Sequence, residues 1–226
     1  MLERLIMGGY MMIPLGICSV VMVAVILERS IAFRRNSRLD IRTLRTKVRN
    51  LVGEGKVDEA MTLCASTASP VAAVLLVGLQ TCKRSQIMRA SAPLQRQLMK
   101  EAMDDYTPQA LHVVELRLNW LATIANVAPL FGMTGTVTGM IRSFGSLAGA
   151  GSLDAGVVGA GISEALVATA SGLIVALISL IPYNAFMNKV AKVNLEIGEA
   201  ASDLVQAAAL RGESDSQSLR IPPDAP

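Results

Sequence analysis

Residues 155–188 read AGVVGAGISEALVATASGLIVALISLIPYNAFMN, a stretch with one charged side chain, Glu164, that ends just before Lys189. A helix needs about 20 consecutive apolar residues to cross the roughly 30 Å of hydrocarbon in a bilayer. This stretch is longer than one crossing requires. It therefore predicts a helix that spans a membrane and projects into water at one end.

Two other runs are also free of charge over the length of a span. The first covers residues 5–27 and ends at Glu28 and Arg29, and the second covers residues 118–141. A cleaved signal peptide would have a basic start and a shorter apolar core, so we interpret the first run as a retained helix. The apolar run 70–82 is about half the length of a span and predicts a helix outside the bilayer. The sequence thus predicts an all-α membrane protein with three transmembrane helices.

The composition supports this fold class. Hydrophobic residues make up 52% of the 226 residues but aromatic residues only 4%, and the mean hydropathy is +0.46. A soluble domain with this many aliphatic side chains would bury them in shorter pieces. The net charge of +3 is concentrated after the first apolar run and gives little support for nucleic-acid binding.

The basic residues predict the orientation. Short loops rich in Lys and Arg stay on the cytoplasmic side of a membrane. The first span has Arg4 on one side and, on the other, Arg29, Arg34, Arg35, Arg38, Arg42, Arg45, Lys47 and Arg49. We therefore expect a periplasmic N-terminus before the first helix (1–28) and a cytoplasmic helical loop (29–117). Residues 118–188 would hold the second and third spans with a short periplasmic connection at about 143–154.

The segment after the third span has two predicted parts. In residues 189–211, apolar side chains recur at alternating spacings of three and four, which is typical of a helix packed against partners. They are Val190, Val193, Ile197, Ala200, Leu204 and Ala207. We expect a cytoplasmic helical extension there. Residues 212–226 are rich in Ser, Asp, Gln and Pro and predict a disordered tail.

Glu164 is the first candidate functional residue. A carboxylate within an apolar span costs about 2.5–3.5 kcal/mol on insertion scales and should face a bundle interior or a watery cavity. Its own span holds no Lys, Arg or His to neutralise it. We expect an unpaired carboxyl group that takes up and releases a proton. The alternative is that Glu164 lies near the outer interface and only reaches water or caps a helix.

Hydroxyl and small residues accompany Glu164 in the second and third spans. Thr136 and Thr169 are candidates for the lining of a proton pathway, although threonines in membrane helices often only bond their own backbone. Small side chains allow helices to approach closely in lipid. The residues that we expect to pack in this way are Gly132, Gly135, Gly139, Ala168 and Gly172.

Covalent catalysis is not expected from this sequence. The spans contain no His, and the chain has no HExxH motif and no phosphate-binding loop with its lysine. Cys18, Cys64 and Cys82 lack the spacing of metal ligands and are interpreted as reduced, structural residues. We therefore predict no enzyme activity, no cofactor and no metal site.

Two motifs on consecutive spans carry a family resemblance. They are APLFGMTGTVTGM at residues 128–140 and GISEALVATASGL at residues 161–173. Both resemble the ExbB/TolQ/MotA family of proton-channel proteins. Three spans with a large first cytoplasmic loop are similar to the ExbB and TolQ branches, and ExbB is the first choice.

The resemblance implies an assembly and a mechanism. It implies a homopentamer, a helical bundle around a central pore, that encloses a dimer of an ExbD/TolR-like single-span partner in the bacterial inner membrane. An Asp of the partner would carry the proton past Thr136 and Thr169, and Glu164 matches the family's pore-lining acid. Proton flow would then drive a TonB-like protein and transport at the outer membrane. A TolQ-like role in envelope maintenance and a non-conducting scaffold that binds partners or membrane lipid are the alternatives.

Overall fold

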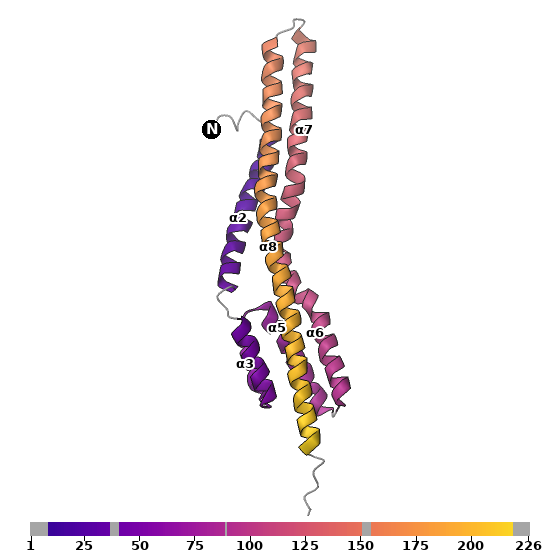
Figure 1. Cartoon of the computed structure of the whole chain (residues 1–226). Coiled ribbons are helices and arrows are strands. Elements are labelled where there is room, and N and C mark those ends of the chain that lie inside the picture. Colours follow the sequence, from indigo (N-terminus) through magenta and orange to yellow (C-terminus); the bar gives the residue numbers. More distant parts are fainter. Residues whose placement is uncertain (1–8, 37–40, 89, 151–154, 219–226) are drawn as a thin grey trace, which may run out of the picture. The chain divides into compact units, whose positions relative to one another are not determined.

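The computed structural model describes residues 9–36, 41–88, 90–150 and 155–218 (Figure 1). They form helices α2 (Met12–Asn36), α3 (Ile41–Gly53), α4 (Val57–Ser66), α5 (Pro70–Ile87), α6 (Ala92–Glu115), α7 (Leu118–Ala150) and α8 (Ala155–Ser218). The chain divides into two compact units. Unit 1 comprises Met1–Ala32 and Leu116–Met187, and unit 2 comprises Phe33–Glu115 and Asn188–Pro226.

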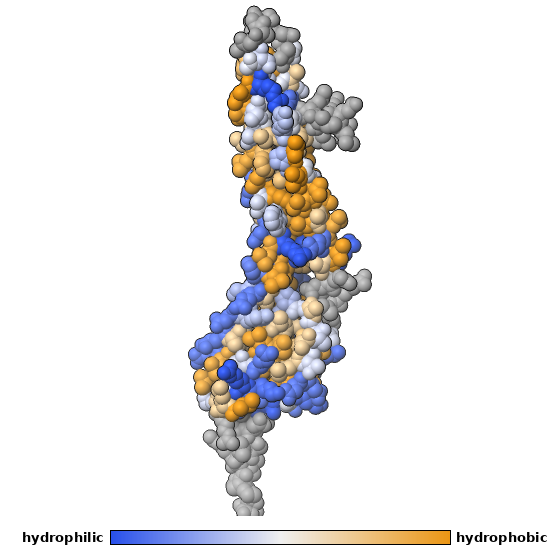
Figure 2. Space-filling view, turned by 180° about the vertical axis from the view of Figure 1, so that it is seen from behind, coloured by the Kyte–Doolittle hydropathy of each residue, from blue (hydrophilic) through white to orange (hydrophobic). Residues whose placement is uncertain are grey.

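Three helices are long and apolar enough to cross a membrane. The candidate spans are Met12–Arg34, Leu118–Ser146 and Val158–Arg211. Many of their large apolar side chains are exposed, among them Ile13, Ile17, Leu173 and Leu177. Hydrophobic side chains accordingly cover broad areas on the surface of unit 1 (Figure 2). The prediction of an all-α membrane protein with three membrane-spanning helices is confirmed.

The first two spans differ in extent from the apolar runs. Helix α2 begins at Met12 rather than Leu5, because Gly9 has a φ of +70° and lies in a turn that the Met12 N–H closes on the Gly9 carbonyl at 3.1 Å. It continues past Glu28 to Asn36, whereas residues 1–8 lie outside the described part of the chain. Helix α7 extends beyond Ile141 to Ala150, so Arg142 and the first part of the connection expected at about 143–154 belong to the helix.

Unit 2 has its own core, built from α3, α5, α6 and the second half of α8. Its largest fully buried side chains include Val48, Leu75, Leu79, Met103 and Leu204. The repeat predicted for residues 189–211 is confirmed. Five of its members are buried, namely Val190, Ile197, Ala200, Leu204 and Ala207, whereas Val193 is half-buried. The run 70–82 lies in α5, which is a helix but not a candidate span.

An ion-pair cluster links α3 to α8 within unit 2. The Arg45 guanidinium donates to Asp203 and to Glu199, each at 2.5 Å. The hydrogen bonds from Asp203 and then Glu199 raise the pKa of Arg45 above its ordinary value. One residue of the basic run is therefore neutralised internally and helps to hold the C-terminal part of α8.

The C-terminal part of the chain stays helical further than predicted. Helix α8 ends at Ser218, so the disordered tail expected from Gly212 is helical over residues 212–218. Residues 219–226, the rest of that tail, lie outside the described residues. An established helix gains one hydrogen bond for each residue that it adds, and polar composition alone does not stop it.

All three cysteines are free thiols. Burial raises the pKa of the Cys64 thiol to about 11 and also raises that of Cys82. Both side chains are buried in unit 2, where they act as small apolar groups. Their environment fits the structural role expected for them.

Replacement of Leu204 by Ala tests the core of unit 2. Leu204 is 1% exposed, whereas Leu195, on the same helix, is 69% exposed. We expect Leu204→Ala to lower the free energy of unfolding by about 2–5 kcal/mol because it leaves a cavity. Leu195→Ala should change it by less than about 1 kcal/mol. Thermal unfolding of the full chain in detergent measures both, and equal effects would contradict this core.

Candidate functional site

Helices α7 and α8 contact each other closely through small residues in unit 1. A methyl group added at Gly172 would lie 2.6 Å from the Ala128 carbonyl oxygen and 3.1 Å from the Cα atom of Gly132. Further along, Gly135 faces Ala168 and Gly139 faces Ala165. Methyl groups added at these two glycines would lie 2.7 and 3.0 Å from the Cβ atoms of Ala168 and Ala165, respectively. Residue numbers rise on α7 as they fall on α8, so the two helices are antiparallel, as Figure 1 shows.

Two hydroxyl groups of α8 hydrogen-bond the backbone of α7. The Thr169 hydroxyl donates to the Gly132 carbonyl at 3.0 Å, and the buried Ser179 hydroxyl donates to the Leu121 carbonyl at 2.7 Å. Both bonds require a close approach of the backbones, which the small residues allow. Thr169 thus lies inside the helix pair of a single chain.

Thr136 has a different environment. Its hydroxyl donates at 2.7 Å to the Met133 carbonyl on its own helix, and its side chain is half-buried. This matches the alternative in which a threonine bonds its own backbone. Thr136, Glu164 and Thr169 lie on one helix pair, but each has a different partner.

Glu164 is paired with a cation, contrary to expectation. The Arg142 Nη1 atom of α7 donates to the Glu164 Oε1 atom of α8 at 3.1 Å. The side chains are 52% and 28% exposed, respectively. The prediction of an unpaired carboxyl group was wrong because it considered only cations within Glu164's own span, and the partner lies on the preceding helix.

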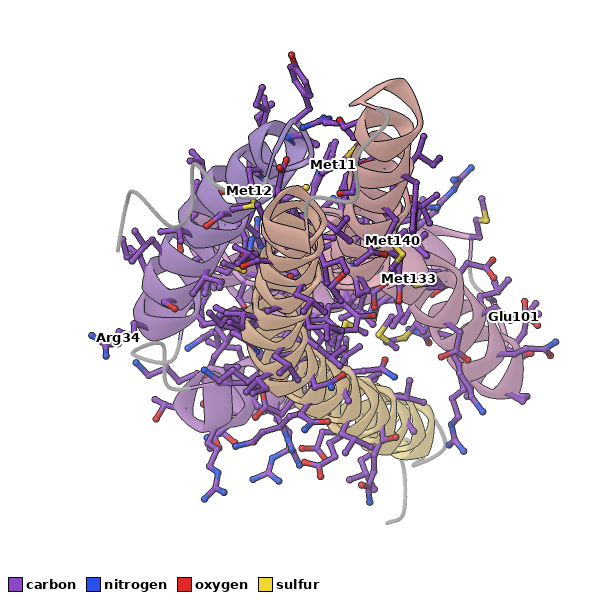
Figure 3. All side chains as sticks on the ribbon, turned by 90° about the horizontal axis from the view of Figure 1, so that it is seen from above. Met11, Met12, Arg34, Glu101, Met133 and Met140 are labelled. Atoms are coloured by element: carbon purple, nitrogen blue, oxygen red, sulfur yellow. The ribbon has the colours of Figure 1, made fainter. Side chains whose placement is uncertain are left out.

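The turn before α2 lies against this ion pair. Gly9 has no side chain, and a Cβ atom there would collide with the Glu164 Oε1 atom. The Arg142 guanidinium lies over the Tyr10 ring, 5.5 Å from its centroid, which is within the range of a cation–π interaction. Met11, labelled in Figure 3, approaches Gly135, where an added methyl group would lie 3.5 Å from its Cβ atom. Two helices and the turn before α2 therefore contribute to one polar cluster, which we call the Glu164 cluster: Gly9, Tyr10, Arg142 and Glu164.

A groove of about 660 Å³ adjoins the Glu164 cluster. It is lined on α2 by residues that include Ile13, Leu15 and Gly16, and on the other helices by Arg142, Ser171 and Val175. The lining is mainly apolar with one guanidinium. The groove therefore places apolar side chains on one side of the Arg142 guanidinium.

Within the described ranges, no group of three or more His, Cys, Asp or Glu side chains could hold a metal ion. The polar groups of the site are instead hydroxyls, one carboxylate and one guanidinium. These groups can position water, donate hydrogen bonds or carry a proton along a pathway.

Sequence reasoning missed Arg142, Gly9, Tyr10 and Ser179. The signal for Arg142 was present, because residues equally far from the connection of an antiparallel helix pair face each other. Arg142 and Glu164 lie at nearly equal distances from the connection around residues 151–154. No such signal exists for Gly9 and Tyr10, whose positions depend on a turn.

The part of the chain that holds this site is similar in sequence to known proteins. The sequence model of the MotA/TolQ/ExbB proton channel family matches residues 66–199. The chain is 32% identical over 183 residues to the putative biopolymer transport protein ExbB-like 3 of Synechocystis, which covers 79% of this chain and 81% of that protein.

Other relatives are similar to a shorter part of the chain. The chain is 36% identical over 86 residues to the biopolymer transport protein ExbB of Salmonella typhimurium, 38% of this chain and 35% of that protein. It is also 36% identical over 97 residues to the Tol-Pal system protein TolQ of Haemophilus influenzae, 43% of this chain and 42% of that protein. The chain thus spans about a third of the length of this ExbB and less than half of this TolQ.

Gly172→Val tests the close approach of α7 and α8. A larger side chain must push the Ala128 carbonyl and Gly132 backbone away, so we expect a loss of about 1–3 kcal/mol in stability. Gly159→Val on the same helix is the control, because an added Cβ meets nothing within 4 Å there. The thermal unfolding midpoints of both variants in detergent give the comparison. Equal midpoints would contradict this packing.

Proposed function

Because the chain belongs to the MotA/TolQ/ExbB proton channel family, we propose that it is a subunit of a proton-driven energy transducer in the bacterial inner membrane. The observation that carries the proposal is the set of polar groups on the α7–α8 pair, within the segment that matches the family. Glu164 and Thr169 lie in otherwise apolar spans. Ionisable residues in such spans are costly and mark ion or proton pathways.

The proposed pathway runs between chains. A row of exposed apolar side chains lies on α7, at spacings of three and four residues: Leu130, Met133, Val137, Met140 and Phe144. Met133 and Met140, seven residues apart, lie on the same side of α7 (Figure 3). Such a repeat suits packing against another helix. We assign this face to contacts in a homopentamer that surrounds a dimer of an ExbD/TolR-like single-span protein.

Within this assembly, Thr136 and Thr169 would line the pathway, and the partner's intramembrane carboxyl would carry the proton. Thr136 is half-buried in the isolated chain and available to a neighbour. The small residues Gly132, Gly135, Gly139, Ala168 and Gly172 would hold the pore-forming helices together. One charge that crosses 100 mV releases about 2.3 kcal/mol, so a few protons supply substantial work.

The proposed output is the energising of transport at the outer membrane through a TonB-like protein. Relatives named ExbB support this role, whereas relatives named TolQ support an envelope-maintenance role as the second candidate. Growth tests distinguish them. Expression in bacteria that lack ExbB should restore TonB-dependent uptake, and expression in bacteria that lack TolQ should not restore detergent resistance.

The proposed topology places the N-terminus in the periplasm and the C-terminus in the cytoplasm. The basic residues of α2 and α3, including Arg34 and Arg42, follow the first span and support this orientation. In this topology unit 2 would face the cytoplasm and the Glu164 cluster would lie toward the periplasmic end of the spans.

Thr169→Val tests the proton pathway. The change keeps the shape of the side chain but removes the hydroxyl, so we expect proton flux to fall by about tenfold or more, a barrier increase of about 1.4 kcal/mol. Thr123→Val is the control, since the Thr123 hydroxyl is exposed and bonds its own helix at Asn119. Flux into proteoliposomes containing the chain and its single-span partner is the measurement. Full flux through Thr169→Val would contradict the pathway.

The native mass of the purified complex tests the assembly. We expect five copies of the chain, with a partner dimer added when an ExbD-like protein is co-expressed. The exposed apolar row on α7 would be covered in such a complex. Native mass spectrometry in detergent reports both masses. A monomer that captures no partner would support a scaffold and contradict the stator proposal.

A further inference from the structure

Besides Glu164, the Glu164 cluster contains groups that the proposed pathway does not use. A carboxylate from α8, a guanidinium from α7 and an aromatic ring from the turn before α2 meet there. We infer that Arg142 is the counter-ion of Glu164 and positions its carboxylate, with the Gly9–Tyr10 turn closing over the pair. The inference deepens the proposed proton pathway and rests on it.

The first argument is electrostatic. A lone charge within an apolar span is costly, and pairing two opposite charges offsets much of that cost. The Arg142 Nη1 and Glu164 Oε1 atoms are 3.1 Å apart, and the Arg142 side chain lines a mainly apolar groove. Between Ala155 and Lys189, Glu164 is the one charged residue of α8, so its cation must come from another helix. Arg142 on α7 meets this need.

The second argument is geometric. A guanidinium is planar, always charged and able to bond a carboxylate while stacking on an aromatic ring. Arg142 does both, since it donates to Glu164 and lies over Tyr10. Its orientation is therefore fixed from two sides. A carboxylate bonded to such a group has a defined position.

The third argument concerns Gly9. Its φ of +70° is favourable for glycine, and the place of a Cβ atom is taken by the Glu164 carboxylate. The turn is closed by hydrogen bonds from the Met12 and Ile13 N–H groups to the Gly9 and Tyr10 carbonyls, at 3.1 and 3.2 Å. The backbone of this turn therefore covers the carboxylate directly. The groups that face Glu164 from the other elements are Arg142 on α7 and Gly9 in the turn before α2, and Tyr10 of the same turn lies against Arg142.

Because Arg142 acts through Glu164, the effect of an Arg142 variant on proton flux should depend on whether Glu164 is present. Arg142→Gln should lower proton flux by about tenfold, and Arg142→Lys, which keeps the charge, should lower it by less than about threefold. In a chain that already carries Glu164→Gln, the Arg142→Gln change should have no further effect on flux. A residue that served only to hold the fold would lower flux in both backgrounds.

The experiment measures proton flux in proteoliposomes with the full chain and its single-span partner. Arg117→Gln is the matched control, because it breaks the Arg117–Glu28 ion pair elsewhere in unit 1 and should leave flux unchanged. Gly9→Ala should lower flux by about threefold or more through displacement of the carboxylate. Gly16→Ala should not, since a Cβ atom at Gly16 meets nothing within 4 Å.

A second readout separates this inference from the proposed function. If the unmodified chain carries no proton flux, the pathway is wrong, and the thermal midpoints of the two single variants and the Arg142→Gln/Glu164→Gln double variant still test the pair. Non-additive midpoints support the pair. Wild-type flux through Arg142→Gln, or additive midpoints, would overturn the inference.

Discussion

The close approach of α7 and α8 is the constraint on which the rest of unit 1 depends. Lipid offers no hydrophobic force to press two apolar helices together, so backbone proximity and interhelical hydrogen bonds supply the attraction. Gly132 and Gly172 leave room for one backbone to touch the other. The Thr169 and Ser179 hydroxyls then reach carbonyls on α7. Larger side chains at the glycines would remove the contact and, with it, both hydrogen bonds.

The register of this helix pair also determines where charges meet. Once Gly132 faces Gly172 and Gly139 faces Ala165, the antiparallel arrangement brings Arg142 opposite Glu164. Neither charge needs to be accommodated by itself in an apolar environment. The tight packing is thus both the framework of the site and the reason that it can hold a carboxylate.

The sequence predicted the parts of the fold that depend on periodicity. Runs without charge predicted three spans, and alternating apolar spacings predicted the buried side of α8 from Val190 to Ala207. It did not predict the start of α2, which depends on the positive φ of Gly9, or the partner of Glu164, which lies on another helix. Composition suggested a tail from Gly212, but helical hydrogen bonding continues to Ser218. These differences depend on a turn, on a contact between two helices and on the continuation of a helix, none of which a pattern of apolar or polar residues specifies.

Helix α8 carries both kinds of contact along one continuous helix of 64 residues. Its first half has small residues and one carboxylate in unit 1, whereas its second half has large apolar residues in the core of unit 2. Unit 2 holds that second half firmly, through Leu204 in the core and the Arg45 ion pairs with Glu199 and Asp203. The same helix therefore depends on close backbone packing in unit 1 and on large buried side chains and ion pairs in unit 2.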